Sequence, residues 1–172
     1  LASVANPFNI TIDDASGHVY TANFGNSTVS KITSEGVVTQ SWAALASGGG
    51  IYDIVVDASG NVYTANNSYS TVSKITPAGV VTQSWAALAS GTDVVGLAVD
   101  AFDNIYTANY TPNTVSKITP AGVITQSWAA LASGANPRNI RIDASGNIYT
   151  ANYGNNTVSK ICVLPTITTS AS

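Results

Sequence analysis

A four-residue string recurs along this chain at a constant interval and constrains its fold more than any other feature. Tyr-Thr-Ala-Asn begins at Tyr20, Tyr63, Tyr106 and Tyr149, at a spacing of 43 residues. Thr-Val-Ser-Lys-Ile follows each copy, and Thr-Gln-Ser-Trp-Ala-Ala-Leu-Ala-Ser follows the first three. A period of this length indicates a tandem array in which each repeat is one supersecondary unit.

Each repeat is predicted to form four short strands, a to d. Strand a covers segments such as 139–143 and ends at an Asp-Ala-Ser-Gly-Asn turn. Strand b follows, as at 148–151, and strand c is the Thr-Val-Ser-Lys-Ile string. A Thr-Pro-Ala-Gly turn leads to strand d, as at 80–85, and its Pro and Gly set the backbone angles of a reversal. β-Branched and aromatic runs between such turns are typical of antiparallel strands.

These repeats predict the fold class. A lone four-stranded sheet leaves apolar surface wet on both faces, so repeats of this length stack face to face around an axis. We therefore predict an all-β protein, a β-propeller of four antiparallel blades that is either four-bladed or half of a larger ring. A linear β-solenoid is the alternative, but its repeats are usually shorter. The predicted blades span approximately 4–47, 48–90, 91–133 and 134–161, and 162–172 is a degenerate last strand or a Ser/Thr-rich linker.

The composition excludes several classes of protein. Charged residues make up 9% of the chain, against about 25% in an average soluble domain. The net charge is −3 and the Lys and Arg residues are scattered, which argues against nucleic-acid binding. No apolar run approaches the roughly 20 residues of a membrane helix, so the chain is not predicted to span a membrane. Cys162 is the only cysteine and is expected to be a small buried residue.

The start of the chain and its surface chemistry suggest where it works. Because it begins at Leu1 and contains no Met, it is expected to be a piece of a longer precursor. A surface rich in Ser, Thr, Asn and Gly, without an internal disulfide, fits an extracellular or cell-surface protein. Near-identity between repeats makes exchange between chains easy, which favours a homo-oligomer formed through blade pairing.

One repeat carries a family resemblance. The segment 136–156 reads Asn-Pro-Arg-Asn-Ile-Arg-Ile-Asp-Ala-Ser-Gly-Asn-Ile-Tyr-Thr-Ala-Asn-Tyr-Gly-Asn-Asn. It resembles an NHL-type blade and is similar to the blades of streptogramin (virginiamycin B) lyases. This resemblance implies a propeller, a fold that serves protein, RNA and sugar binding as well as catalysis.

The lyases of that family use His and Glu residues with a divalent metal at the centre of the ring. Here the only His is His18, beside a turn between strands a and b, and the only Glu is Glu35, in a turn between strands c and d. Both turns are expected on the face opposite the usual site. We therefore predict no catalytic residues, no metal site and no cofactor.

The repeats differ from one another mainly in two loops. The loop entering strand a reads Asn-Pro-Phe-Asn at 6–9, Gly-Ile-Tyr-Asp at 50–53, Asp-Val-Val-Gly at 93–96 and Asn-Pro-Arg-Asn at 136–139. The loop between strands b and c begins at Phe24, Asn67, Tyr110 and Tyr153. In an up-and-down blade both loops project from the same face, which is the common ligand face of propellers.

This face supplies the candidate ligand-binding residues. Aromatic platforms beside amides and carboxylates suit sugars or peptides, because the ring stacks on the ligand and the polar groups orient it. Unconstrained drift in surface loops is the alternative explanation of the variation. The candidates are Phe8, Asn9, Phe24, Tyr52, Asp53, Asn67, Asp93, Tyr110, Arg138, Asn139 and Tyr153.

Three features common to the repeats have structural explanations. The Asp that opens each a–b turn, such as Asp57, is expected to accept N–H groups of its own turn, because one carboxylate per turn is too little for calcium. The repeated Lys on strand c is expected to pack its stem along the sheet. The repeated Trp at the end of strand d, such as Trp85, is expected to pack between blades.

The sequence predicts a non-enzymatic extracellular module with an interaction or structural role. One alternative is a glycan- or peptide-binding propeller that uses the variable face. Another is a lyase-like metal-dependent enzyme, in which acid–base work would fall to Asp53 and Asp93. The last is a self-assembling fibre subunit. The partner is thus predicted to be a protein, a glycan or a second copy of the chain.

Overall fold

The computed structural model describes residues 5–163, and these form β-strands and one short 3-10 helix. Blade 1 contains β1 (Pro7–Asp13), β2 (His18–Asn23), β3 (Thr28–Ile32) and β4 (Val38–Ala44). Blade 2 contains β5 (Ile51–Val56), β6 (Val62–Asn66), η1 (Asn67–Tyr69), β7 (Thr71–Ile75) and β8 (Val81–Ala87). Blade 3 contains β9 (Val94–Val99), β10 (Ile105–Asn109), β11 (Thr114–Ile118) and β12 (Ile124–Ala130). Blade 4 contains β13 (Pro137–Ile142), β14 (Ile148–Asn152) and β15 (Thr157–Ile161).

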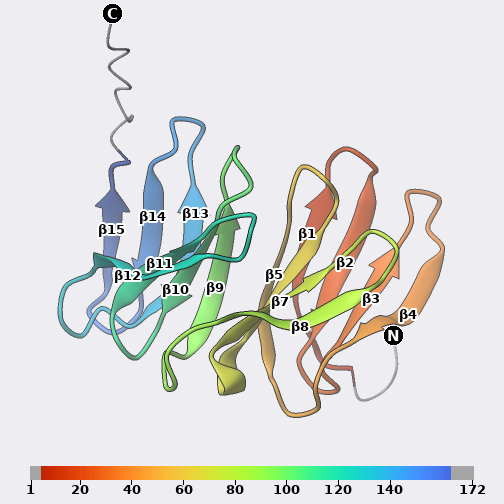
Figure 1. The fold of residues 1–172 in the computed structure, drawn as a ribbon, viewed down its shortest axis with the longest axis horizontal. Coiled ribbons are helices and arrows are strands. Elements are labelled where there is room, and N and C mark those ends of the chain that lie inside the picture. Colours follow the sequence, from red (N-terminus) through yellow and green to blue (C-terminus); the bar gives the residue numbers. More distant parts are fainter. Residues whose placement is uncertain (1–4, 164–172) are drawn as a thin grey trace, which may run out of the picture.

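The strands of each blade pair antiparallel in chain order. Figure 1 shows the four sheets side by side, with β1, β5, β9 and β13 packed against one another in that order on the inside. The prediction of an all-β propeller with four antiparallel blades is therefore confirmed. Blade 4 has three strands in the described part of the chain, and the predicted last strand or linker falls almost entirely on 164–172, outside it.

Each contact between neighbouring blades joins two different faces. The forward face of a blade presents Tyr, Ala and Val side chains to the next blade, such as Tyr63, Ala65 and Val72 of blade 2. The rear face presents Ile, Leu and Val to the preceding blade, such as Leu97 and Ile105 of blade 3. The same pairing recurs between blades 1 and 2 and between blades 3 and 4, so three similar apolar clusters form the core.

Strand a begins earlier than the sequence suggested. The last three residues of each predicted four-residue loop before it already belong to β1, β5, β9 and β13. The reason is a β-bulge near the start of each inner strand, where one residue is left without a partner on strand b, as between Pro7 and Asn9. A bulge disrupts the hydrogen-bond ladder locally and re-aims a side chain without ending the strand.

The Asp and Lys common to the repeats behave as expected, whereas the expectation for the single cysteine is wrong. Asp57 Oδ1 accepts the N–H groups of Ser59 and Asn61 at 3.0 and 2.8 Å, so its turn is closed by its own carboxylate. The ammonium of Lys74 lies 5.5 Å from the ring centroid of Tyr63 and 5.7 Å from that of Trp85. Cys162, by contrast, is exposed, because no described strand of blade 4 covers the edge of β15.

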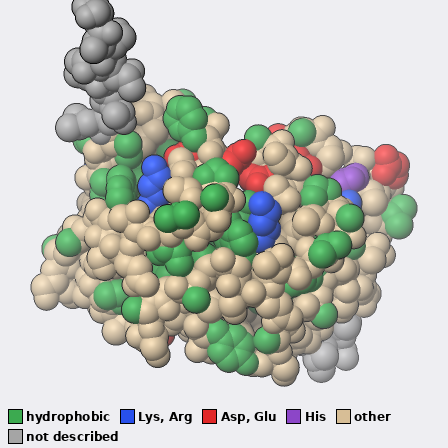
Figure 2. Space-filling view, in the orientation of Figure 1, with side chains coloured by type: hydrophobic (Ala, Val, Ile, Leu, Met, Phe, Trp, Pro, Cys, Tyr) green, Lys and Arg blue, Asp and Glu red, His purple; other side chains and the backbone are tan. Residues whose placement is uncertain are grey.

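Two further properties of the surface agree with the composition. Figure 2 shows few charged side chains, and the acidic ones gather along the upper edge of the molecule, where Figure 1 shows hairpin turns. Among the described residues, no helix has the length and hydropathy needed to cross a bilayer.

Candidate ligand-binding face

The bulges place one side chain from every blade around a single cavity. The bulged residues occupy the same position in the four repeats and are Phe8, Tyr52, Val95 and Arg138. All four line a cavity of about 460 Å³, together with Asn67, Asp93, Tyr110 and Asn139. The backbone is thus repeated four times, while the chemistry that it presents changes from aromatic to aliphatic to cationic.

An equivalent backbone hydrogen bond in each blade holds the loop between strands b and c against the inner strand. The first residue after strand b donates its N–H to a backbone carbonyl at the entry of strand a, as Tyr110 does to Asp93 at 3.1 Å. The four acceptors, Asn6, Gly50, Asp93 and Asn136, all have a positive φ between 43° and 55°. Gly, Asn and Asp tolerate this left-handed conformation better than other residues. Both variable loops are therefore fixed on one face by the same hydrogen bond.

Aromatic rings crowd the side of the cavity formed by blades 1 and 2. The ring centroid of Phe8 lies 5.3 Å from that of Tyr52 and 6.1 Å from that of Phe24. Phe24 and Tyr52 meet edge to face at 5.4 Å. Such pairs hold one another in place, and Phe8 remains largely exposed. This side of the cavity is therefore lined by a cluster of aromatic rings that contact one another.

A cation lies on the opposite side, in blade 4. The guanidinium of Arg138 lies 4.4 Å from the ring centroid of Tyr153 and 5.4 Å from that of Tyr110. Stacking between two rings orients a guanidinium while leaving its N–H edge able to donate hydrogen bonds. Nearby, Asp93 accepts a hydrogen bond from the Thr111 hydroxyl. The cavity thus combines aromatic rings with oriented donors and acceptors.

Asp53 serves the interior and does not line the cavity. Its carboxylate accepts hydrogen bonds from the Asn9 side chain at 2.6 Å, the Leu97 N–H at 2.7 Å and the Ile54 N–H at 2.9 Å. It therefore ties the inner strands of blades 1, 2 and 3 together. Burial raises the pKa of this carboxyl above its usual range, although the three hydrogen bonds favour the ionised form.

The structure sorts the eleven residues predicted for the site into three groups. Seven line the cavity, namely Phe8, Tyr52, Asn67, Asp93, Tyr110, Arg138 and Asn139. Phe24 and Tyr153 pack behind Phe8 and Arg138. Asn9 and Asp53 bond to each other between blades 1 and 2. Sequence reasoning missed Val95, an aliphatic residue whose repeat position, shared with Phe8, Tyr52 and Arg138, was the available signal.

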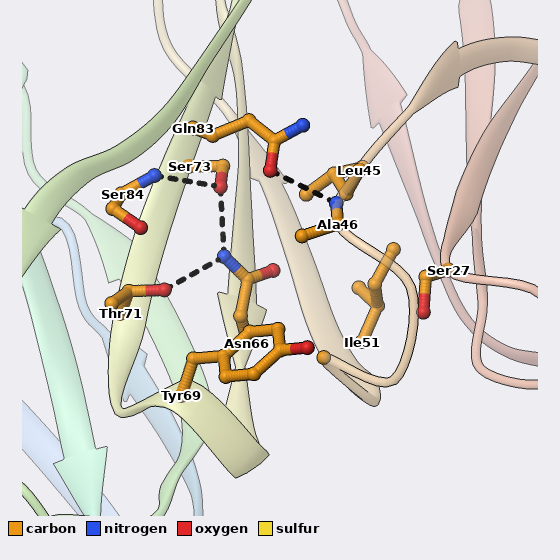
Figure 3. A pocket seen from close by; sticks show the side chains of 11 residues that line it. Ser27, Leu45, Ala46, Ile51, Asn66, Tyr69, Thr71, Ser73, Gln83 and Ser84 are labelled. Atoms are coloured by element: carbon orange, nitrogen blue, oxygen red, sulfur yellow. Dashed lines mark hydrogen bonds between the residues drawn. The ribbon is translucent and has the colours of Figure 1, made fainter.

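A much smaller cavity between blades 1 and 2 is structural. Figure 3 shows Asn66 within it, donating to Ser73 Oγ at 2.8 Å and to Thr71 Oγ1 at 3.1 Å. Gln83 of blade 2 accepts the N–H of Ala46 in blade 1 at 2.9 Å. The cavity measures about 20 Å³, room for about one water molecule. With its amide paired, Asn66 stabilises the end of β6 that leads to Asn67 at the large cavity.

The lone histidine and glutamate lie elsewhere. His18 is at the turn between β1 and β2, and Glu35 follows β3, so both belong to the set of turns opposite the large cavity. Hydrogen bonds from Ser34 and Thr33 lower the pKa of Glu35. Within residues 5–163 there is no group of three or more His, Cys, Asp or Glu side chains arranged to hold a metal ion.

Comparison with known proteins defines the fold more closely. No family model and no curated protein matches the sequence. Among solved structures, a streptogramin B lyase aligns over 93% of this chain and 52% of its own, with a TM-score of 0.79 and 16% identity. Virginiamycin B lyase from Staphylococcus aureus aligns over 95% and 58%, with a TM-score of 0.80 and 18% identity.

A third similar structure belongs to a protein of different function. Hydrazine synthase from Kuenenia stuttgartiensis aligns over 93% of this chain and 47% of its own, at a TM-score of 0.77 and 18% identity. The chain thus spans about half the length of the structures it matches. The resemblance to streptogramin lyase blades is confirmed for the fold, and at this level of identity it extends no further.

Proposed function

We propose that this chain is a non-enzymatic, extracellular binding module that captures an oligosaccharide in the cavity between the inner strands. The observation that carries the proposal is the ring of bulged residues, in which one backbone position presents Phe8, Tyr52, Val95 and Arg138 to a shared space. Drift would also vary these loops, but the varied side chains converge on one cavity, which favours selection for a ligand.

The chemistry of the cavity favours a sugar. Its volume of about 460 Å³ is in the range of small-molecule sites, roughly 300–1,000 Å³. A pyranose presents an apolar face to an aromatic ring and hydroxyls around its rim, and Phe8 and Tyr52 supply such rings. Asn67, Asn139 and Arg138 provide amide and guanidinium donors for the hydroxyls.

The carboxylates at the cavity are too few for catalysis of glycosidic-bond cleavage. Asp53, one of the two carboxylates available for acid–base work, is committed to three hydrogen bonds in the interior. Asp93 is left as a single carboxylate at the cavity, where hydrolysis of a glycosidic bond usually requires a pair. A lone carboxylate suits recognition of sugar hydroxyls.

The test is a screen of neutral oligosaccharides on an array, followed by calorimetric titration of the best binder. Tyr52→Ala should weaken binding about tenfold, because a lost aromatic contact of about 1.4 kcal/mol corresponds to that factor. The matched control is Phe102→Ala, since Phe102 is an exposed aromatic residue in the turn between β9 and β10, on the opposite face. The bound sugar should be recovered chemically unchanged.

Two results would refute sugar binding in this cavity. One is the absence of binding to any arrayed sugar by the folded chain. The other is an equal loss of affinity in Tyr52→Ala and Phe102→Ala, which would place the sugar outside the cavity. Release of a shortened or modified sugar would replace the binding module with an enzyme.

A further inference from the structure

Within residues 5–163, the first and last blades each leave one face without a neighbouring blade. On the rear face of blade 1, Ile10 and Ile12 are 59% and 56% exposed, whereas Ile54 and Leu97, at the position of Ile10 in blades 2 and 3, are 2% and 0% exposed. On the forward face of blade 4, Val158 is 71% exposed, whereas Val72 and Val115 are fully buried. Both exposed faces are therefore core surfaces of the repeat.

The forward face of blade 4 is also hollowed. A groove of about 420 Å³ runs over Tyr149, Ala151 and Val158, with Arg141 and Ile140 at its inner side. In blades 1 to 3 the side chains equivalent to Tyr149 and Ala151 are buried under the rear face of the following blade. Figure 2 shows hydrophobic side chains at the left end of the molecule, where Figure 1 places blade 4.

The contacts between neighbouring blades show which kind of surface packs against this groove. Three times within the molecule, a forward face of Tyr, Ala and Val packs against a rear face of Ile, Leu and Val. The uncovered rear face of blade 1 carries the same residue types, with Ile10, Ile12, Val19 and Ile32 at the positions of Ile54, Val56, Val62 and Ile75. The two open faces are thus complementary to each other and not to themselves.

We propose that these two faces join two copies of the chain head to tail, so that blade 4 of each copy packs against blade 1 of the other. Each copy offers one forward and one rear face, so two copies leave none uncovered. Eight blades lie within the usual range of four to eight for closed propellers. A repeated head-to-tail contact closes into a ring when its rotations sum to a full turn.

This assembly would also complete the cavity of the ligand-binding face. The bulged residues Phe8 and Arg138 lie at the two ends of the inner-strand series β1, β5, β9 and β13. Head-to-tail closure brings Phe8 of one copy beside Arg138 of the other. The bulged residues of both copies then form a continuous ring around the axis.

The experiment measures the native mass of the 172-residue chain by light scattering and native mass spectrometry. The expected species has twice the chain mass of 17.5 kDa. Ile10→Asp and Val158→Asp should each return it to the single-copy mass, because each damages both contacts of the ring. Both side chains are exposed in the single copy, so circular dichroism and thermal unfolding at low concentration should show intact folding.

Mixing the two variants gives the decisive result. The Ile10→Asp chain keeps an unaltered forward face on blade 4, and the Val158→Asp chain keeps an unaltered rear face on blade 1. One of the two contacts in a mixed pair is therefore intact. A two-copy species containing one chain of each kind should therefore form, at lower affinity than the wild type. A single-copy wild type, open-ended polymers, or a mixture that stays single-copy would each overturn the proposal.

Discussion

The same five residues, Thr-Val-Ser-Lys-Ile, form the third strand of blade 3 and of blade 4, yet they meet different surroundings. Val115 of blade 3 is fully buried, and Val158 of blade 4 is 71% exposed. Their sequences and hydrogen-bonding partners on strand b correspond residue for residue. The difference arises because blade 3 has a neighbour on its forward face and blade 4 has none among the described residues. In a repeat protein, the burial of a side chain is a property of the neighbour as much as of the repeat.

The largest expected effect is on the free energy of unfolding. It comes from truncating the Ile side chain at one repeat position, first in a middle blade and then in an end blade. Ile54→Ala should lower the free energy of unfolding by about 3 kcal/mol, because it opens a cavity in the core between blades 1 and 2. Ile10→Ala, at the same position in blade 1, should cost no more than about 0.5 kcal/mol, the usual effect of a surface substitution.

Both substitutions are made in the Val158→Asp chain, so that pairing of copies does not cover Ile10, and are measured by urea unfolding. Equal losses would mean that blade 1 is covered within the single chain, which would abolish the difference between middle and end blades. A larger loss for Ile10→Ala than for Ile54→Ala would contradict the packing described here.

Features that depend on interactions within one repeat could be predicted from the sequence, whereas features that depend on the neighbouring blade could not. The strands were predictable because their signals are local, such as the Asp that closes its own turn and the Gly that follows. The seven cavity residues were predictable because variation among the repeats identifies the loops on one face. Val95 was missed because an aliphatic residue carries no chemical signal apart from its repeat position.

Other aspects depend on contacts that no single repeat encodes. Asp53 and Asn139 occupy one repeat position, and both were predicted to bind ligand. The structure buries Asp53 because the N–H of Leu97 comes from the following blade, while Asn139 remains exposed at the end of the series. Cys162, expected to be a small buried residue, is exposed, because the fourth strand that covers the equivalent edge in blades 1 to 3 is absent from the described part of blade 4.

A smaller change in the free energy of unfolding is expected from exchanging amide and carboxylate at the repeat position shared by Asp53 and Asn139. Asp53→Asn replaces one acceptor oxygen with a donor, which leaves a buried N–H unpaired and should cost about 1–3 kcal/mol. Asn139→Asp, on the exposed side, should change the free energy of unfolding by no more than about 0.5 kcal/mol. Chemical denaturation of the two variants beside the wild type measures both values. If the costs were equal, the hydrogen bonds of Asp53 would contribute nothing to the cohesion of the inner strands.

The smallest effect is a pair of opposite pH dependences, one in blade 2 and one in blade 4. Burial raises the pKa of Asp53 above 3.8 in the folded chain. The carboxyl therefore ionises at a lower pH in the unfolded chain than in the folded chain. Its contribution to the free energy of unfolding should therefore decrease as the pH rises from 3.8 through the pKa of the folded state. The hydrogen bond from the Asn147 side chain, helped by further donors, lowers the pKa of Asp143 below 3.8. The stability that Asp143 contributes should be present above pH 3.8 and be lost as the pH falls below it.

Urea midpoints of the wild type, Asp53→Asn and Asp143→Asn across the acid range separate these two slopes. Relative to the wild type, the Asp53→Asn chain should gain stability as the pH rises through the acid range, and the Asp143→Asn chain should lose it. Slopes of the same sign would mean that both carboxyls have the same environment, and the contrast between a carboxylate held among three blades and one held only by its own turn would fail. Opposite slopes would show that burial among three blades determines how Asp53 responds to protons, and that the hydrogen bonds of its own turn determine how Asp143 responds.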